Sequence, residues 1–171
     1  MLILLRGINV GGHNKVPMAE LRAALDADGF DEIATYIQSG NIAVTTQASP
    51  KDCAERVAQI LVASFDVDVP VIALPQAQAG DIADAASFDT DGNPAYQLVY
   101  FASGPVDVSG VNALDRDRFA GDEIAATSDA VYVHYGEGQS KSKLTVDHLE
   151  KAAGVRLTGR NLKSVAKLRS L

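Results

Sequence analysis

The sequence has little of what marks a secreted, zinc-binding or membrane-spanning protein. One cysteine, Cys53, in 171 residues cannot form an intramolecular disulfide, and no Cys/His group has zinc-ligand spacing. No run of about 18 apolar residues could span a bilayer. The first residues lack the basic, apolar and small-residue order of a signal peptide. We therefore expect a cytoplasmic protein with no metal, no cofactor and no membrane partner.

Tryptophan is absent and aromatic residues make up only 6% of the chain, but 47% of the residues are hydrophobic. That share is ordinary for a soluble globular protein. A chain of this length can bury a sizeable core without disulfides. The sequence therefore predicts a globular fold.

Positive charge is scarce over most of the chain. Residues 1–137 hold 7 Lys/Arg against 20 Asp/Glu, whereas residues 138–171 hold 8 against 2. A protein that coats duplex DNA needs a broad positive surface, so we expect no broad duplex binding. A local site for an anionic small molecule or a nucleic-acid end stays open. The sequence does not predict the oligomeric state.

Apolar periodicity and turn residues predict the order β-α-β-β-α-β twice. In the first half we expect strands at 2–9, 32–38, 41–46 and 69–74, a helix from about Pro17 to Gly29, and a second behind the N-cap Ser49. In the second half we expect strands at 95–103, 123–127, 130–135 and 155–158, and helices at 109–119, at 145–153 and from 161 to the end. A short helix at 78–86 and a polar loop at 89–94 lie between.

This order indicates an α+β protein of two tandem ferredoxin-like (βαββαβ) subdomains with antiparallel sheets, plus a C-terminal helix. We expect an N-terminal subdomain at 1–75, a helical linker at 76–94, and a second subdomain with the terminal helix at 95–171.

The expected topology brings two polar segments together. In a βαββαβ unit the third strand lies between the first and second and runs opposite to both. The end of the first strand and the turn between the second and third strands therefore share one edge. This predicts that Arg6, Asn9 and the Gly11-Gly12 loop lie close to the segment Gln38–Asn41.

The leading hypothesis is an anion site at this edge. The spacing of Gly7 and Gly12 fits a phosphate loop, but His13 and Asn14 stand where the Walker pattern has Lys and Ser/Thr. Exposed amides in a Gly-rich loop beside a helix N-terminus still suit an anion. The ligand would carry phosphate or carboxylate. The candidate ligand-binding residues are Arg6, Asn9, Gly11, Gly12, Lys15, Gln38, Ser39, Asn41, Lys143 and Arg160.

Two alternatives stay open. An enzyme at the same surface would need a base or nucleophile, for which Ser39, His13 and Tyr36 are the local candidates. We assign no catalytic residue and leave open whether the chain is an enzyme. A structural or interaction module would instead use its polar loops to fix the two subdomains together.

The C-terminal segment offers further cations. On the C-terminal helix, Arg160, Lys163 and Lys167 are spaced i, i+3 and i+7 and form one stripe. That stripe fits an ordinary amphipathic helix, or it joins Lys141 and Lys143 in an anion-binding wall. Cys53 lies on the apolar face of its helix, which favours a buried side chain over a nucleophile.

Several motifs resemble those of the domain-of-unknown-function 1697 family. They are Leu4–Gly12, Asn14–Met18, Thr35–Asn41, Ser142–Leu144, Leu149–Lys151 and Arg160–Asn161. The chain departs from the family pattern at His13, where Lys is expected, and at Leu162, where Trp is expected. The resemblance implies a small bacterial α+β protein of two similar subdomains. It implies no established activity.

Overall fold

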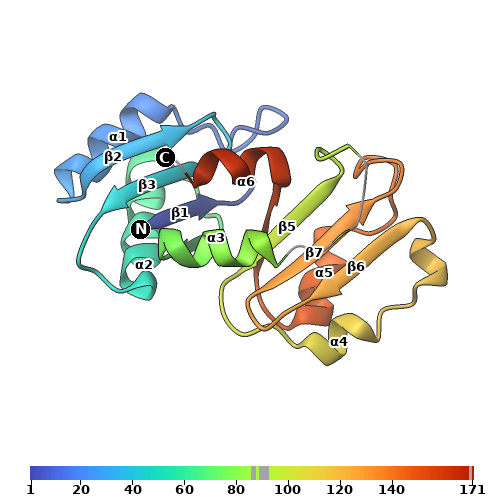
Figure 1. Cartoon of the computed structure of the whole chain (residues 1–171). Helices are drawn as coiled ribbons and strands as arrows, with labels where there is room; N and C mark the ends of the chain where they lie inside the picture. The colour runs from blue at the N-terminus through green and yellow to red at the C-terminus, as the bar shows by residue number, and fades with distance from the viewer. Residues whose placement is uncertain (86–87, 89–92, 170) are drawn as a thin grey trace. The chain divides into compact units, whose positions relative to one another are not determined.

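The structure, a computed structural model, describes residues 1–85, 88, 93–169 and 171 (Figure 1). The chain forms two compact units, which we call unit 1 (Met1–Ala79 with Lys167–Leu171) and unit 2 (Gly80–Ala166). The division falls within helix α3 (Gln76–Asp84) and helix α6 (Leu162–Leu168). The boundaries expected at residues 75 and 94 stay a prediction.

Unit 1 contains a four-stranded sheet in the order β2-β3-β1-β4, with every neighbouring pair antiparallel. Its elements are β1 (Leu2–Leu5), α1 (Met18–Ala27), β2 (Asp31–Tyr36), β3 (Asn41–Thr45), α2 (Pro50–Phe65) and β4 (Val71–Leu74). The third strand therefore lies between the first and second, as the topology predicts.

The core of unit 1 forms where helices α1 and α2 pack on one face of this sheet (Figure 1). Alternate strand residues point to this face because side chains in a strand alternate sides. The strands supply Ile3, Leu5, Ile42 and Val44, and the helices supply Leu21, Leu25, Cys53, Val57 and Leu61. The expected burial of Cys53 is confirmed.

Unit 2 repeats this topology with the order β6-β7-β5-β8, again antiparallel throughout. Its elements are β5 (Gln97–Ala102), α4 (Val108–Asn112), the 3-10 helix η1 (Asp117–Phe119), β6 (Asp122–Ala126), β7 (Ala130–Tyr135), α5 (Val146–Ala153) and β8 (Leu157–Asn161). The α+β class with two ferredoxin-like units is confirmed.

Strand β1 and helix α3 differ from the prediction in the first half of the chain. Strand β1 ends at Leu5 rather than Asn9, because Gly7 (φ +68°) and Asn9 (φ +54°) turn the backbone out of the extended conformation. The short helix α3 begins at Gln76, not at residue 78. Its expected last residue, Ala86, and residues 89–92 of the expected polar loop lie outside the described residues.

The helix expected at 109–119 and the last strand differ in the second half. The helix expected at 109–119 is split, because the carboxylate of Asp115 accepts hydrogen bonds from the amides of Asp117 and Arg118 and starts a new turn. Strand β8 extends to Asn161, so Arg160 lies in a strand. The stripe that placed Arg160 on the terminal helix is therefore wrong.

Candidate functional site

The end of β1 and the β2–β3 hairpin meet at one end of the unit 1 sheet. Leu4 pairs with Asn41, and the amide of Leu5 donates to the Gly40 carbonyl at 2.8 Å. The Asn9 side-chain amide donates to the Gln38 carbonyl at 2.9 Å. The predicted meeting of these two segments is confirmed.

Asn9 braces the loop at residues 6–17, which we call the glycine loop. Its Oδ1 accepts from the Val16 amide at 2.9 Å, and its Nδ2 donates to the Val16 carbonyl at 2.9 Å in addition to Gln38. Its own amide donates to the Asn14 carbonyl at 3.0 Å. Both hydrogens of this side-chain amide are thus used within the protein, so Asn9 positions the loop.

Other short contacts complete the glycine loop. The Asn14 side chain donates to the Gly7 carbonyl at 3.0 Å, and the His13 amide donates to the Val10 carbonyl at 3.0 Å. Asn9 and Asn14 both have positive φ, which Asn tolerates better than most residues. The loop is therefore held by its own backbone and side chains before any ligand arrives.

Asn41 plays a similar part in the hairpin. Its side chain is 0% exposed, and its Nδ2 donates to the Tyr36 carbonyl at 3.1 Å and to the Ser39 hydroxyl at 2.9 Å. Asn41 therefore fixes the conformation of the turn through these two hydrogen bonds. Ser39 is half-buried in the same network.

The tip of the glycine loop is exposed. Gly11, Gly12, His13 and Lys15 all face solvent, and Gln38 is exposed on the adjoining hairpin. Arg6 is half-buried at the base of the loop. Helix α1 follows directly, and its N-cap residue is a proline that gives no side-chain cap to the first turn. Uncapped amides at a helix N-terminus favour a nearby anion.

Two aliphatic side chains are exposed beside these polar groups. Val10 on the glycine loop is 63% exposed and Ile37 on the hairpin is 52% exposed. The side-chain bond from Asn9 to Gln38 ties together the segments that carry them. This end of unit 1 thus presents amides, cations and a little apolar surface together.

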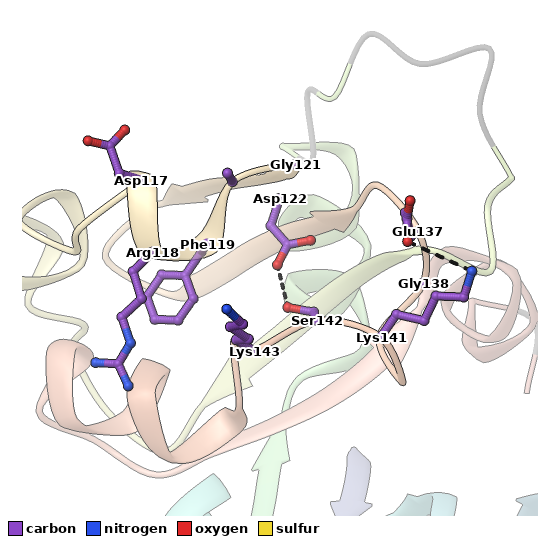
Figure 2. A pocket seen from close by; sticks show the side chains of 11 residues that line it. Asp117, Arg118, Phe119, Gly121, Asp122, Glu137, Gly138, Lys141, Ser142 and Lys143 are labelled. Carbon is purple, nitrogen blue, oxygen red and sulfur yellow. Dashed lines mark hydrogen bonds and ion pairs between the residues drawn. The ribbon is translucent and has the colours of Figure 1, made fainter.

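Lys143 and Arg160 lie in unit 2 and are described within that unit. Arg160 is 8% exposed, and its Nη1 donates to the Thr158 hydroxyl at 3.0 Å and to the Gly159 carbonyl at 2.9 Å. Burial lowers the pKa of Arg160 to about 10, so the guanidinium is charged at neutral pH. Lys143 is exposed and lines a pocket (Figure 2).

The sequence interpretation missed most of this pocket. Besides Lys141 and Lys143 it is lined by residues 117–122, which lead into β6, and by Glu137, Gly138 and Ser142, which follow β7. The available signal was the segment Gly136–Lys143, which carries two glycines, two serines and two lysines.

The three catalytic candidates do not form a catalytic arrangement among the described contacts. Ser39 accepts a hydrogen bond from the Asn41 side-chain amide, which is not a base. His13 is exposed on the glycine loop, and Tyr36 is the last residue of β2. Burial raises the pKa of the Cys53 thiol, which disfavours the reactive thiolate.

Neither a metal centre nor a membrane helix is found in the part of the chain that the structure describes. No three His, Cys, Asp or Glu side chains there gather as metal ligands would. No described helix is both long and apolar enough to cross a bilayer.

These features define a class: α+β proteins of two ferredoxin-like units, one of which carries a braced glycine loop. The chain belongs to the family described as "Protein of unknown function (DUF1697)", whose model matches residues 1–132. It is similar in fold to a solved structure, the conserved bacterial protein SP0830 from Streptococcus pneumoniae. The two are 24% identical, with a TM-score of 0.75 over 99% of this chain and 96% of that chain. No curated protein matches.

Proposed function

We propose that this chain is a cytoplasmic binding protein that takes an anionic ligand, carrying phosphate or carboxylate, at the tip of the glycine loop. The supporting observation is the brace formed by Asn9, which joins the loop to the β2–β3 hairpin through its hydrogen bonds to Val16 and Gln38. A loop held in place before binding loses less conformational freedom when a ligand binds.

In this proposal the candidate residues divide into those that contact the ligand and those that brace the site. Lys15 and the amides of Gly11 and Gly12 contact the anion from the exposed tip, and Arg6 supports it from the base. Gln38 contacts the ligand from the hairpin. Asn9, Ser39 and Asn41 keep the two segments in register, since their side chains bond within the protein. Cations are scarce in the first 137 residues, with 7 Lys/Arg, so a pair at one loop attracts anions locally.

Calorimetric titration tests this proposal. The probes are a panel of phosphorylated and carboxylated metabolites and a short oligonucleotide with and without a 5′-phosphate. We expect at least one anion to bind, and Lys15→Ala or Arg6→Ala to weaken that binding roughly tenfold. The matched control is Lys51→Ala, because Lys51 is an exposed lysine of the same unit on helix α2.

Added salt should weaken binding further, since exposed charges are screened. A preference for the phosphorylated oligonucleotide would assign a nucleic-acid end, and a preference for a metabolite would assign a small molecule. Equal affinities for wild type and Arg6→Ala and Lys15→Ala, or no binding by any anion of the panel, would overturn the site.

A further inference from the structure

A pocket of about 230 Å³ lies in unit 2 and shares no residue with the glycine loop (Figure 2). Its volume lies below the range of about 300–1,000 Å³ that is usual for drug-sized ligands. A ligand of this pocket is therefore small. The lining residues are Asp117, Arg118, Phe119, Ala120, Gly121, Asp122, Glu137, Gly138, Lys141, Ser142 and Lys143.

The two walls of the pocket are joined to each other. The Gly136 amide donates to the Gly121 carbonyl at 3.1 Å, and the Ser142 hydroxyl donates to the Asp122 carboxylate. A side chain at Gly136 would not fit, because its Cβ would lie 2.3 Å from the Gly121 oxygen. The close approach of the walls thus depends on glycine at this position.

The segment after β7 is also fixed from within. The Leu144 amide donates to the Ser142 hydroxyl at 2.8 Å, and Leu144 itself is buried. The Gln139 side chain donates to the buried Tyr100 hydroxyl at 3.1 Å. The pocket therefore has a preformed shape, which reduces the entropy that a ligand must lose with it.

Charges of both signs line the pocket. Three cationic side chains, Arg118, Lys141 and Lys143, stand with the three carboxylates of Asp117, Asp122 and Glu137. Figure 2 shows Asp117 directed away from the other labelled side chains. A polyanion such as a nucleotide would meet carboxylates here, and a polycation would meet lysines. Complementarity therefore favours a ligand that carries one charge of each sign.

Some of these charges already have partners. Lys141 lies 3.8 Å from Glu137, and Arg118 lies over the Phe119 ring and 3.2 Å from a His148 ring nitrogen. Within the described part of the chain, the Lys143 ammonium has no partner. It is thus the first cation that an incoming carboxylate would meet.

Asp122 supplies the opposite charge. Its carboxylate is half-buried and accepts from Ser142 through Oδ2, which leaves Oδ1 as an acceptor. The buried ring of Phe119 adds apolar surface to the same pocket. A cation, a carboxylate and an aromatic ring are the three groups that an amino acid engages through its carboxylate, ammonium and side chain.

We propose that this pocket binds a small zwitterion of the α-amino acid class, with the ligand carboxylate on Lys143 and the ligand ammonium on Asp122. The site is separate from the anion site proposed on the glycine loop. No covalent step is required, because the pocket only holds the ligand.

Calorimetric titration of the full chain with each of the twenty amino acids tests the proposal. We expect one or a few to bind, and expect the matching carboxylic acid without the amine, and the amine without the carboxylate, to bind at least roughly tenfold more weakly. Lys143→Met and Asp122→Asn should each weaken binding to a similar degree. Asn at position 122 retains an acceptor for Ser142, so the walls of the pocket stay joined.

Two controls make the result decisive. Lys151→Met removes an exposed lysine of the same unit outside this pocket and should leave the affinity unchanged. Lys143→Arg should restore most of the binding that Lys143→Met loses. Binding that survives Lys143→Met, equal binding of the deaminated acid, or no binding of any amino acid would overturn the proposal.

Discussion

Units 1 and 2 share one topology but elaborate different connections. In unit 1 the long connection follows the first strand, at residues 6–17, and the connection from β3 to α2 is short, at residues 46–49. In unit 2 the connection after the first strand is short, at residues 103–107, whereas residues 136–145 after β7 form the long one. The same fold thus places its longest loop at a different end of the sheet in each unit.

The two long loops lie at different ends of their sheets because of strand direction. The first and third strands of a βαββαβ unit are antiparallel, so the end of the first strand and the end of the third lie at opposite ends of that unit's own sheet. In unit 1 the long loop adjoins the β2–β3 hairpin, and in unit 2 it adjoins the start of β6, since Asp122 pairs with Tyr135. A shared fold therefore carries no expectation of a shared site.

The largest expected effect on stability concerns Gly40, in the β2–β3 hairpin of unit 1. Gly40 has φ +77°, and a Cβ there would lie 2.5 Å from the Leu5 Cβ. The positive φ costs about 1–2 kcal/mol for a non-glycine residue, and overpacking adds about 1–3 kcal/mol. We expect Gly40→Ala to lower the free energy of unfolding by roughly 3 kcal/mol, measured by urea denaturation.

Gly12→Ala is the matched control for this prediction. Gly12 also has a positive φ (+82°), but a Cβ there meets nothing within 4 Å. The expected loss is about 1–2 kcal/mol, from backbone strain alone. Equal losses for the two variants would contradict the claim that the hairpin and β1 pack this closely.

The part of unit 1 that follows from topology could be predicted from the sequence. The pairing of Leu4 with Asn41 requires only the strand order, and the strand order follows from the predicted sequence of elements. The Asn9 brace could not be predicted in the same way. It depends on a left-handed backbone at Asn9, which places one side-chain amide between Val16 and Gln38.

The pocket of unit 2 could be predicted only in fragments. The sequence identifies Lys143 as a candidate cation. Asp122 lines the same pocket, but it lies in an edge strand whose sequence has no feature that indicates a site. Arg160 was given the wrong environment because a short segment with few apolar residues fits a strand and a helix equally well. Pairing of β8 with β5, including Arg160 with Val99, decides in favour of the strand.

The second prediction uses the buried hydroxyl pair of unit 2, which has no tyrosine counterpart in the described core of unit 1. The Tyr135 hydroxyl lies 2.7 Å from that of Tyr100. Burial, with further contributions from Tyr100 and Asp122, raises the pKa of Tyr135 well above its usual range. The folded state therefore keeps a proton that the unfolded state loses at high pH.

Tyr135 makes the stability of the fold decline at high pH. Since the folded pKa is raised, the contribution of Tyr135 to stability is full below about pH 10, the ordinary tyrosine pKa, and is lost as the pH rises further. The loss is about 1.4 kcal/mol for each pH unit above that value. We expect Tyr135→Phe to show a smaller decline between pH 9 and 11 in urea denaturation. A decline as steep as in wild type would refute this.

The smallest effects concern the helix caps, which compare the two units directly. In unit 1 the Ser49 hydroxyl accepts from the Asp52 amide at 3.1 Å at the start of α2. In unit 2 Thr145 and His148 bond reciprocally at the start of α5. Replacing a cap of this kind by alanine costs about 1 kcal/mol. We expect Ser49→Ala and Thr145→Ala each to lower the free energy of unfolding by that amount.

The chain contains a separate probe for each unit. Cys53 is the sole cysteine and lies on α2 of unit 1, so thiol labelling reports exposure of that unit. Four of the 5 tyrosines, at positions 96, 100, 132 and 135, lie in unit 2, so tyrosine fluorescence reports chiefly on unit 2.

If the units unfold separately, Ser49→Ala accelerates labelling of Cys53 and leaves the fluorescence transition in place, and Thr145→Ala does the reverse. If they unfold together, each variant shifts both probes equally. Ser49→Asn, which keeps an acceptor at the cap, should restore the wild-type labelling rate, and a variant that shifts neither probe would show that its cap adds nothing to stability.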